Sequence, residues 1–587
     1  MLPGDWICNS SLRWPSNSTL FGSAEVTVVC SLSQSSIEDS PFALMSTSLQ
    51  TLSLATNNVP GCDTIRTVGS PAAGVGSWID VRVTPAHLSG APYQIVSITS
   101  VGDGNFDVKL DRPVLYAALA ASAIAVSVVP CRYVRIFGNG MRVVGVCNGY
   151  MELQGAIDCQ IEDIIFDAST ASGTAKAGLT VDTFSLRDKF TRIRAVGPGI
   201  SGASVGMWCI GEDHRFTDCE VSDWTVGIVA SDMHHNDLRG TVVHDCGTGI
   251  TVTSDGGATF TPSNSARIVG LTAYGCTTGG VVTQGARNIT LYGCTFRYNT
   301  ASGCVLSDLN GAPVNTRFVG CAFVNNGSNG FADVATAKGT QLIGCDISDN
   351  AAAGLLVSGN VTAIGLTSSG GNATATVQVI AGGRCVVDGF DITCAISGAP
   401  GTLTQSTGII RLVNGRMALT GTANLACQCT GTARCEFIGI RFSFGLASQG
   451  IQATGGVVVV DDCSADGSSV ASSVAVNIGG GATARIGRCN FDACVTPFNY
   501  NPGSLWSRSI DGIPETHVVA TSSTPVDVFF RDLKKSDRIS LTRVMNDGTP
   551  GKTPLVQKTV DTVTPTNSKF TVTADTNDTS MYAYTID

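Results

Sequence analysis

The chain has 587 residues, of which only 14% are charged and 6% aromatic, whereas 68 are glycine. This length exceeds what one ordinary hydrophobic core needs, so we expect either several domains or a repeat architecture. The formal net charge of −10 disfavours a sequence-independent nucleic-acid-binding protein, because such proteins need clustered Lys and Arg to neutralise phosphates.

Residues 1–70 are predicted to form an amino-terminal head. The first residues, MLPGDWICNSSLRW, lack the basic start and continuous apolar core of a secretion signal, so we expect no signal peptide. A serine-rich stretch follows, without the repeat seen later in the chain. The head cysteines Cys8, Cys30 and Cys62 are therefore the best candidates for disulfides within or between chains.

Residues 71–130 are predicted to form a β-rich module that leads into the next region. The sequence WIDVRVTPAHLSGAPYQIVSITSVGDGNFDVKLDRPVLYA alternates apolar and polar residues and is broken by Gly and Pro. Its apolar end, 114–130, is shorter than the roughly 20 residues that a membrane-spanning helix requires. We therefore expect a buried strand there and no insertion into a membrane.

One short motif returns about every 25 residues over 131–503, for example HRFTDCEV at 214, ITLYGCTF at 289 and TRFVGCAF at 316. Each copy contains a turn-forming residue followed by a recurring position that we call the slot. A second apolar run entered through glycine, such as TGITVT at 248, usually follows. The slots are Asn139, Ile164, Ile193, Cys219, Thr241, Leu271, Cys294, Cys321, Cys345, Leu366, Phe390, Gly415, Ile440, Cys463 and Cys489.

This repeat predicts an all-β protein built on a right-handed parallel β-helix of about 15 coils. Propeller and leucine-rich repeats are disfavoured, because the signatures of those repeats do not occur. In a parallel β-helix, slots on successive coils stack about 4.8 Å apart. Six cysteines then form a buried column of free thiols, since this spacing exceeds the usual Cβ separation of a disulfide: Cys219, Cys294, Cys321, Cys345, Cys463 and Cys489.

Two further groups of cysteines lie outside the slots. Cys246 and Cys276 share one offset from their slots, so their side chains are expected to approach each other. Cys427, Cys429 and Cys435 resemble a metal site only weakly, because they lack CxxC pairing. We predict no metal ion and no cofactor.

Titratable residues concentrate in the window 211–246, which holds four of the six histidines. Counting from the slots places Glu212 level with His234, Asp213 with His235, and His214 with Asn236 on adjacent coils.

The same counting places Asp223 level with Asp245, one coil apart. Two close carboxylates raise one pKa, as a general acid requires. The candidate catalytic residues are therefore Asp223, Asp245, Glu212 and Asp213, and the candidate ligand-binding residues are His234, His235, Asp237 and Trp224. The alternative is that these are solvated corner residues.

Residues 504–587 change character again. Cysteine disappears, and the alternating runs VDVFFRDL, RISLTRV and KFTVTADT follow one another. This pattern predicts a compact β-sandwich. Such a domain would also cover the unpaired sheet edge at the end of the helix.

The order of head, β-rich module, Gly/Asn-rich β-helix and terminal β-sandwich resembles bacteriophage tailspike and related spike or fibre proteins of the pectin-lyase-like superfamily. The most similar local stretch is YQIVSITSVGDGNFDVKLDRPVLY at 93, followed by VRIFGNGM at 134 as a first coil. The resemblance implies a homotrimer located in the virion, attachment of residues 1–70 to other virion proteins, and a terminal domain for trimerisation or receptor binding. It also implies a surface that meets bacterial polysaccharide, and synthesis in the host cytoplasm.

Three hypotheses of function follow from the resemblance. The first is a spike or fibre that binds host polysaccharide without cleaving it. The second is a depolymerase that hydrolyses capsule, lipopolysaccharide or exopolysaccharide, and the third is a structural spike of the neck, collar or tail. No catalytic motif of polygalacturonases or pectate lyases is present, so we favour the first.

Overall fold

The structure is a computed structural model of the chain. It describes residues 4–8, 12–30, 40–57, 59, 61–72, 74–83, 93–114, 123–171, 176–181, 185–200, 202–253, 266–283, 286–308, 312–334, 336–395, 399–420, 425–444, 449–466, 473–479, 481–487, 489–491, 494, 496–500, 505–508, 516–520, 526–529, 539–545, 555–559, 569–573 and 581–586. Two compact units divide the chain, one of residues 1–328 with 336–341 and the other of residues 329–335 with 342–587. Each unit is described by itself.

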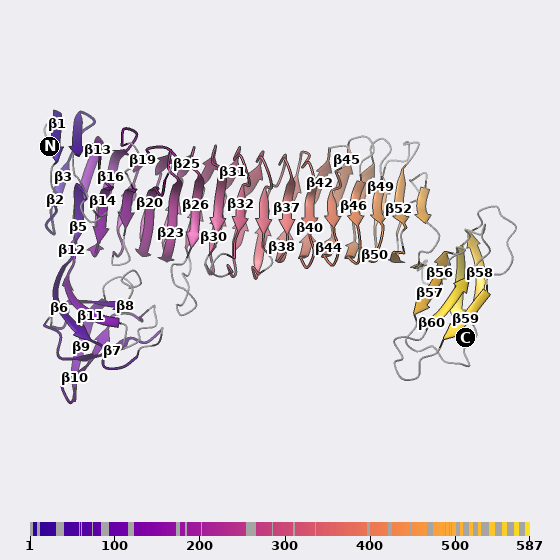
Figure 1. The fold of residues 1–587 in the computed structure, drawn as a ribbon, viewed down its shortest axis with the longest axis horizontal. Helices are drawn as coiled ribbons and strands as arrows, with labels where there is room; N and C mark the ends of the chain where they lie inside the picture. The colour runs from indigo at the N-terminus through magenta and orange to yellow at the C-terminus, as the bar shows by residue number, and fades with distance from the viewer. Residues whose placement is uncertain are drawn as a thin grey trace. The chain divides into compact units, whose positions relative to one another are not determined.

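The described residues form strands and turns and contain no helix. In the first unit, each coil contributes one strand to a sheet that we call the straight sheet. Strands β20, β23 and β26 lie side by side in Figure 1 and pair in parallel. The straight sheet of this unit contains β14 (Gly149–Gln154), β17 (Ala177–Val181), β20 (Val205–Glu212), β23 (Val226–His234), β26 (Thr248–Thr253), β29 (Thr278–Val282) and β32 (Cys304–Leu306).

The opposite side of each coil is what we call the bent sheet. In its first two coils one strand, β13 (Arg135–Gly145) or β16 (Gln160–Asp167), runs through the bend. Later coils give two short strands each: β18 (Lys189–Thr191), β19 (Arg194–Val196), β21 (Arg215–Thr217), β22 (Glu220–Ser222), β24 (Asp237–Arg239), β25 (Val242–His244), β27 (Arg267–Val269), β28 (Thr272–Tyr274), β30 (Thr290–Tyr292), β31 (Thr295–Arg297), β33 (Arg317–Val319) and β34 (Ala322–Val324).

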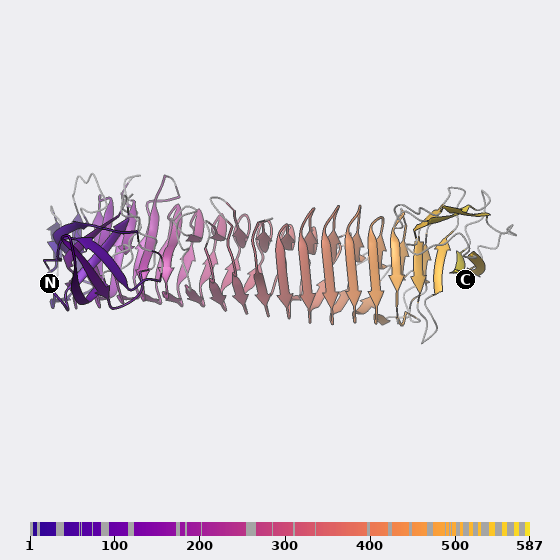
Figure 2. The ribbon, with the colours of Figure 1, turned by 90° about the horizontal axis from the view of Figure 1, so that it is seen from below.

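The second unit repeats both sheets, and Figure 2 shows its coils from below. Its straight sheet contains β35 (Phe331–Asp333), β37 (Ala353–Val357), β40 (Ala375–Val379), β43 (Thr402–Thr404), β46 (Leu425–Cys429), β49 (Gln449–Ala453), β52 (Val474–Ile478) and β54 (Thr496–Tyr500). Its bent side contains β38 (Asn360–Ile364), β39 (Thr367–Ser368), β41 (Arg384–Asp388), β42 (Asp391–Cys394), β44 (Ile409–Val413), β45 (Arg416–Leu419), β47 (Arg434–Ile438), β48 (Arg441–Phe444), β50 (Val457–Asp461), β51 (Ser464–Asp466) and β53 (Thr483–Ile486).

The bend exists because, in thirteen of the described coils, the residue before the slot has a left-handed backbone. This conformation is costly for most L-residues and is accepted by Gly, Asn and Asp. The residues with positive φ directly before a slot are Asp163, Arg192, Asp218, Gly240, Gly270, Gly293, Gly320, Gly344, Gly365, Gly389, Asn414, Gly439 and Asp462. The turn-forming position of the repeat is therefore the corner that directs the slot side chain inward.

The slot cysteines have a common geometry. The Cys294 thiol donates to the Tyr292 carbonyl, two residues earlier, at 3.5 Å, and the Cys463 thiol donates to the Asp461 carbonyl at 3.3 Å. The Thr241 hydroxyl makes the same contact with the Arg239 carbonyl at 3.4 Å. A small side chain with one polar hydrogen therefore suits this corner. Five of the six slot cysteines are buried, Cys489 is half-buried, and none of the 22 cysteines, all of which the structure describes, is in a disulfide.

One slot lies two residues from its predicted place. Asn139 is exposed with a φ of 49°, and Met141 is the fully buried residue that is level with slot Ile164. The coil that contains Asn139 has an extra turn residue, Gly140, with a φ of 84°. Counting from the motif therefore places the slot of this coil two residues too early.

The structure divides the first 130 residues differently from the predicted boundary at residue 70. Strands of the predicted head pair in parallel with the β-helix: β1 (Gly4–Cys8) with β4 (Val26–Cys30), β3 (Thr19–Phe21) and β4 with β13, and β5 (Phe42–Met45) with β14. Residues 4–45 thus begin the β-helix. Cys8 and Cys30 are level on β1 and β4, yet neither is in a disulfide, and nor is Cys62.

A six-stranded antiparallel sheet is inserted between β5 and β13. Its own core contains Ile79, Tyr93 and Val108, all fully buried. This module starts at β6, before residue 71. Its strands are β6 (Thr47–Ser53), β7 (Thr64–Val68), β8 (Trp78–Val83), β9 (Tyr93–Gly102), β10 (Asn105–Leu110) and β11 (Ala123–Val129).

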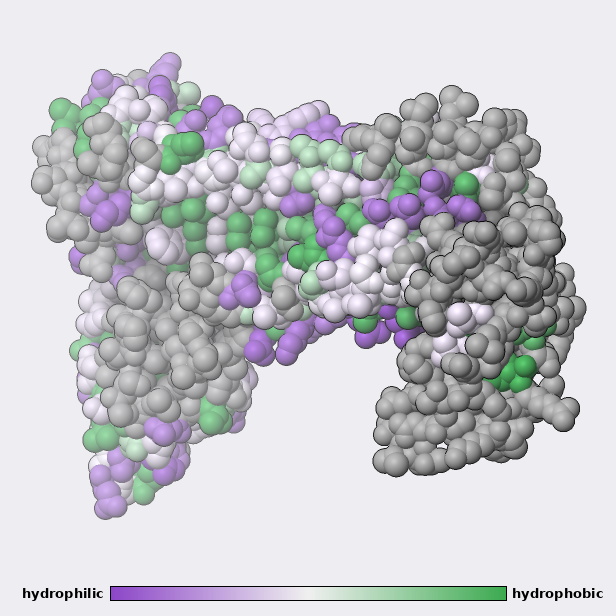
Figure 3. Space-filling view, turned by 45° about the vertical axis from the view of Figure 1, so that its right-hand side comes forward, coloured by the Kyte–Doolittle hydropathy of each residue, from purple (hydrophilic) through white to green (hydrophobic). Residues whose placement is uncertain are grey.

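The last strands belong to two antiparallel pairings. One contains β55 (Leu505–Arg508), β56 (Thr516–Ala520), β58 (Ile539–Met545) and β61 (Met581–Ile586), and the other contains β57 (Val526–Phe529), β59 (Leu555–Thr559) and β60 (Lys569–Thr573). The β-sandwich over 504–587 stays a prediction. On the face drawn in Figure 3, hydrophobic side chains gather in separate patches among weakly polar ones, so this surface is not uniformly charged.

The corner geometry gives a prediction at Gly320, whose φ is 61° and whose missing Cβ would contact nothing within 4 Å. Gly320→Val should lower the free energy of unfolding by roughly 1–2 kcal/mol, because a β-branched residue resists the left-handed conformation. Gly320→Asn should be nearly neutral, since Asn414 occupies the equivalent corner. Chemical denaturation of both variants measures the difference; equal losses would contradict the corner argument.

Candidate functional site

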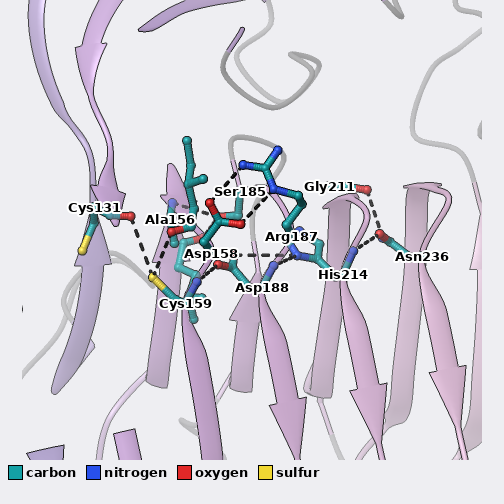
Figure 4. Close-up of polar contacts among 12 residues, drawn as sticks. Cys131, Ala156, Asp158, Cys159, Ser185, Arg187, Asp188, Gly211, His214 and Asn236 are labelled. Atoms are coloured by element: carbon teal, nitrogen blue, oxygen red, sulfur yellow. Dashed lines mark hydrogen bonds and ion pairs between the residues drawn. The ribbon is translucent and has the colours of Figure 1, made fainter. Parts of the chain in front are cut away.

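A column of polar side chains runs through the interior of the first unit (Figure 4). The backbone N–H of Cys159 donates to Asp188 Oδ1 at 2.8 Å, and the backbone N–H of Asp188 donates to His214 Nδ1 at 3.0 Å. The backbone N–H of His214 then donates to Asn236 Oδ1 at 2.7 Å. Each of these side chains thus accepts a hydrogen bond from a backbone N–H of the neighbouring coil. The prediction that His214 and Asn236 occupy equivalent positions on adjacent coils is confirmed.

This column is fully buried, so its titratable groups are held in their neutral forms. Burial raises the pKa of Asp188 well above its usual value and lowers the pKa of His214 to about 3. Charged forms without water or a counterion are costly in such a site. The column therefore stabilises the coils and takes no part in a reaction at the surface.

The expected acidic residues lie in different surroundings. Glu212 is level with His234, as predicted, but it is 5% exposed and its Oε2 lies 3.0 Å from Arg112 Nε of the inserted module. This ion pair attaches the module to the coils, so we do not retain Glu212 as a catalytic acid. The side chain of His234 lies outside the described residues.

Asp213 stands at an exposed corner, with Oδ1 3.8 Å from Nδ1 of His235 on the next coil. The predicted pairing of these residues across adjacent coils is thus present in the geometry. Both line a surface pocket of about 440 Å³ together with Asp158, Arg187, Lys189, Arg215 and Asp237.

A second arrangement lies farther along the bent sheet, on β22 and β25. His244 Nδ1 lies 2.8 Å from Asp245 Oδ2, and its Nε2 lies 3.3 Å from Glu220 Oε1. Burial lowers the pKa of His244, but the hydrogen bonds to Asp245 and Glu220 outweigh it, so the pKa is raised above 6.5. Sequence reasoning included Asp245 but missed His244 and Glu220. Glu220 lies one residue after slot Cys219, and His244 lies three residues after slot Thr241. Because these offsets differ, counting from the slots does not place the two residues beside each other.

Two of the predicted residues have other outcomes. Asp223 occupies the corner equivalent to Asp245, with a φ of 64°, and is half-buried. The proposed carboxylate pair stays a prediction, because the contact seen for Asp245 is with His244. Trp224 is fully buried and its Nε1 donates to the Ala195 carbonyl at 3.2 Å, so it packs in the core and cannot bind a surface ligand.

Aromatic rings continue the outer surface of the bent sheet. Tyr292 and Tyr298 are 37% and 60% exposed. The guanidinium of Arg267 lies 5.1 Å from the Tyr292 ring centre, and His244 stacks on Tyr274 at 5.1 Å. Such contacts fix the rings while leaving one face open.

Among the described residues, no three side chains of His, Cys, Asp or Glu gather where they would hold a metal ion. The cysteines that weakly resemble a metal site, Cys427, Cys429 and Cys435, are buried and free. The described part of the chain also has no helix suited to spanning a bilayer.

Comparisons with known proteins address the fold. Residues 205–373 match the family model described as the right handed beta helix region. No curated protein matches the sequence. With the parallel coils, the match defines a right-handed parallel β-helix protein, which confirms the fold class predicted from the repeat.

Three phage tailspikes are among the similar solved structures. The tailspike of Pseudomonas phage LKA1 has 12% identity and a TM-score of 0.39, covering 99% of this chain and 90% of its own. The tailspike of Acinetobacter baumannii bacteriophage AP22, solved with a capsular saccharide, has 12% identity and a TM-score of 0.36, covering 100% and 90%. The tailspike of Pseudomonas phage phi297 has 11% identity and a TM-score of 0.33, covering 98% and 86%.

The buried histidine predicts a pH dependence of stability. Because the pKa of His214 falls from 6.5 to about 3 on folding, the unfolded chain binds a proton that the folded chain does not. Stability from this group is complete above pH 6.5 and is lost as the pH falls towards 3, at up to about 1.4 kcal/mol per pH unit. Asp188 acts in the opposite direction, because its raised pKa favours the protonated folded state at low pH.

The variant His214→Asn isolates the histidine, because Asn236 already fills the equivalent position on the next coil. Denaturation midpoints between pH 7 and 4 should fall less steeply for His214→Asn than for the unaltered protein. Parallel curves would show that His214 is not held neutral in the folded state.

Proposed function

We propose that the chain is a bacteriophage spike or fibre protein that binds polysaccharide on the host cell surface during adsorption. The observation that carries the proposal is the outer face of the bent sheet in the first unit. There, the exposed rings of Tyr292 and Tyr298 lie on the coil of β30 and β31, two coils beyond the one that holds Asp237 of the pocket and His244.

This face has the chemistry that sugars require. Sugar rings present apolar C–H faces that pack on aromatic rings, and hydroxyl groups that bond to charged and polar side chains. Arg267 and Arg297 lie 5.1 and 5.7 Å from the rings of Tyr292 and Tyr298, which restrains these rings before a ligand binds. A site with fewer freely rotating side chains loses less entropy on binding.

A homotrimer is part of the proposal, and the straight sheet supports it. Its outward positions in the first unit include Val229, Thr251, Val281 and Val305, which are level on successive strands and half-buried. In the second unit the corresponding column is Ala332, Leu356, Gln378, Leu403, Gln428, Gln452 and Asn477. These columns are uncharged, and amides both donate and accept, so a second copy of the same surface is a suitable partner.

Location in the virion rests on the sequence resemblance. We propose that the amino-terminal region contacts other virion proteins and that the last strands contribute to trimerisation or receptor binding. The alternative to this proposal is that the protein is a structural spike of the neck, collar or tail that does not bind glycan.

One observation favours depolymerisation as a second candidate function. His244 bridges Asp245 and Glu220 at the surface, so a proton held by the imidazole lies within reach of a ligand on this face. In this candidate, Asp245 and Asp223 act as the carboxylates that hydrolyse the glycan.

Binding is tested with purified full-length protein and a panel of bacterial capsules, lipopolysaccharides and exopolysaccharides. Combined Tyr292→Ala and Tyr298→Ala should weaken binding at least tenfold, about 1.4 kcal/mol, because the stacking faces are lost. Tyr133→Ala, at another exposed tyrosine, is the matched control and should bind normally. No binding to any member of the panel would contradict the proposed function.

The same incubations distinguish binding from cleavage. Reducing ends that disappear with Asp245→Asn would favour the depolymerase, and binding without reducing ends would favour the adhesin.

The trimer is tested at Val281 by sedimentation. Val281→Lys should shift the protein to a monomer, because three like charges would meet at the proposed interface. Val269→Lys is the control, since Val269 is equally half-buried but faces outward on the bent sheet. A monomeric unaltered protein, or dissociation by both variants alike, would contradict this interface.

A further inference from the structure

The pocket on the bent sheet is lined by three carboxylates and by three cations of Lys and Arg, which are not all paired with one another. All three of its carboxylates have a partner: Asp158 accepts from Arg187 at 2.8 and 3.0 Å, Asp213 lies 3.8 Å from His235, and Asp237 pairs with Arg239. Arg239 lies outside the pocket lining. Asp158 and Asp237 are therefore each paired with an arginine, whereas Asp213 lies beside an imidazole.

Two cations in the pocket lack such a partner. Within the described part of the chain, neither the Lys189 ammonium nor the Arg215 guanidinium makes an ion pair or side-chain hydrogen bond. Both side chains are exposed, and the two residues are directly level on β18 and β21. Their backbones are thus about 4.8 Å apart.

Placing two like charges on adjacent rungs destabilises a sheet unless something compensates them. The next residue in this row is Asp237, but its carboxylate Oδ2 is bonded to Arg239 on its own strand. Lys189 and Arg215 thus lie beside each other without an ion pair of their own, in a chain whose net charge is −10. An anion bound between them would give both cations a partner.

We propose that the polysaccharide bound by this protein carries an anionic substituent, a carboxylate or a phosphate, which binds between Lys189 and Arg215. The guanidinium of Arg215 presents paired N–H donors that suit two oxygens of such a group, and the ammonium adds a point charge. The pocket, at about 440 Å³, has room for a sugar residue beside its charged group. This inference rests on the proposed function and specifies the class of glycan.

The test uses the full-length protein and the same polysaccharide panel, sorted into neutral, carboxylate-bearing and phosphate-bearing members. The polysaccharides that bind should be anionic. Combined Lys189→Gln and Arg215→Gln should weaken their binding at least tenfold, and should also reduce the sensitivity of binding to salt. If the double variant loses affinity for the carboxylate-bearing polysaccharides, the ligand is a carboxylate. If it loses affinity for the phosphate-bearing ones, the ligand is a phosphate.

The matched control is combined Lys338→Gln and Arg384→Gln, which removes the same net charge at exposed positions outside the pocket. It should bind like the unaltered protein. Binding of a neutral polysaccharide that the pocket variant leaves unchanged would overturn this inference and leave the proposed function standing. An equal loss in both double variants would also overturn it, since the effect would then be one of net charge. Absence of binding to the whole panel would overturn both.

Discussion

The structure depends on parallel, in-register hydrogen bonding between successive coils. Each rung repeats the backbone of the previous one, so a residue is level with its counterpart on the next coil, as Phe190 is with Phe216. This constraint brings like residues together. Their rings stack with centres 4.7 Å apart, close to the rung spacing. The left-handed corner residue before each slot maintains this register by turning the chain at the same point in every coil.

The same constraint determines which kinds of side chain each surface of the coils presents. Polar groups in the inward columns bond to the neighbouring coil, as Asn236 does to the Gly211 carbonyl at 2.9 Å and to the backbone N–H of His214. Outward columns are free to differ between sheets. In the first unit the straight sheet presents an uncharged column, whereas the bent sheet presents charges and exposed rings. The proposed function uses this difference, with assembly through one side and ligand recognition through the other.

Much of the fold and of the pairing between coils could be predicted from the sequence, because the spacing of the repeat determines which residues are level on adjacent coils. Counting from slots placed Asp213 beside His235 and His214 beside Asn236, as the structure has them. Counting could not show that Glu212 is covered, since its partner Arg112 lies in a module 100 residues away. It also could not separate a buried from an exposed ring at a corner, so Trp224 was misjudged. The sequence did not point to Lys189 and Arg215, because which charges form ion pairs depends on side-chain geometry.

The most direct test of this account is an experimental structure of the full-length protein with a bound fragment of its polysaccharide. We expect the sugar on the outer face of the bent sheet in the first unit, with rings against Tyr292 or Tyr298 and an anionic group between Lys189 and Arg215. A fragment bound only to the inserted module or to the carboxy-terminal strands, with the bent sheet bare, would contradict it.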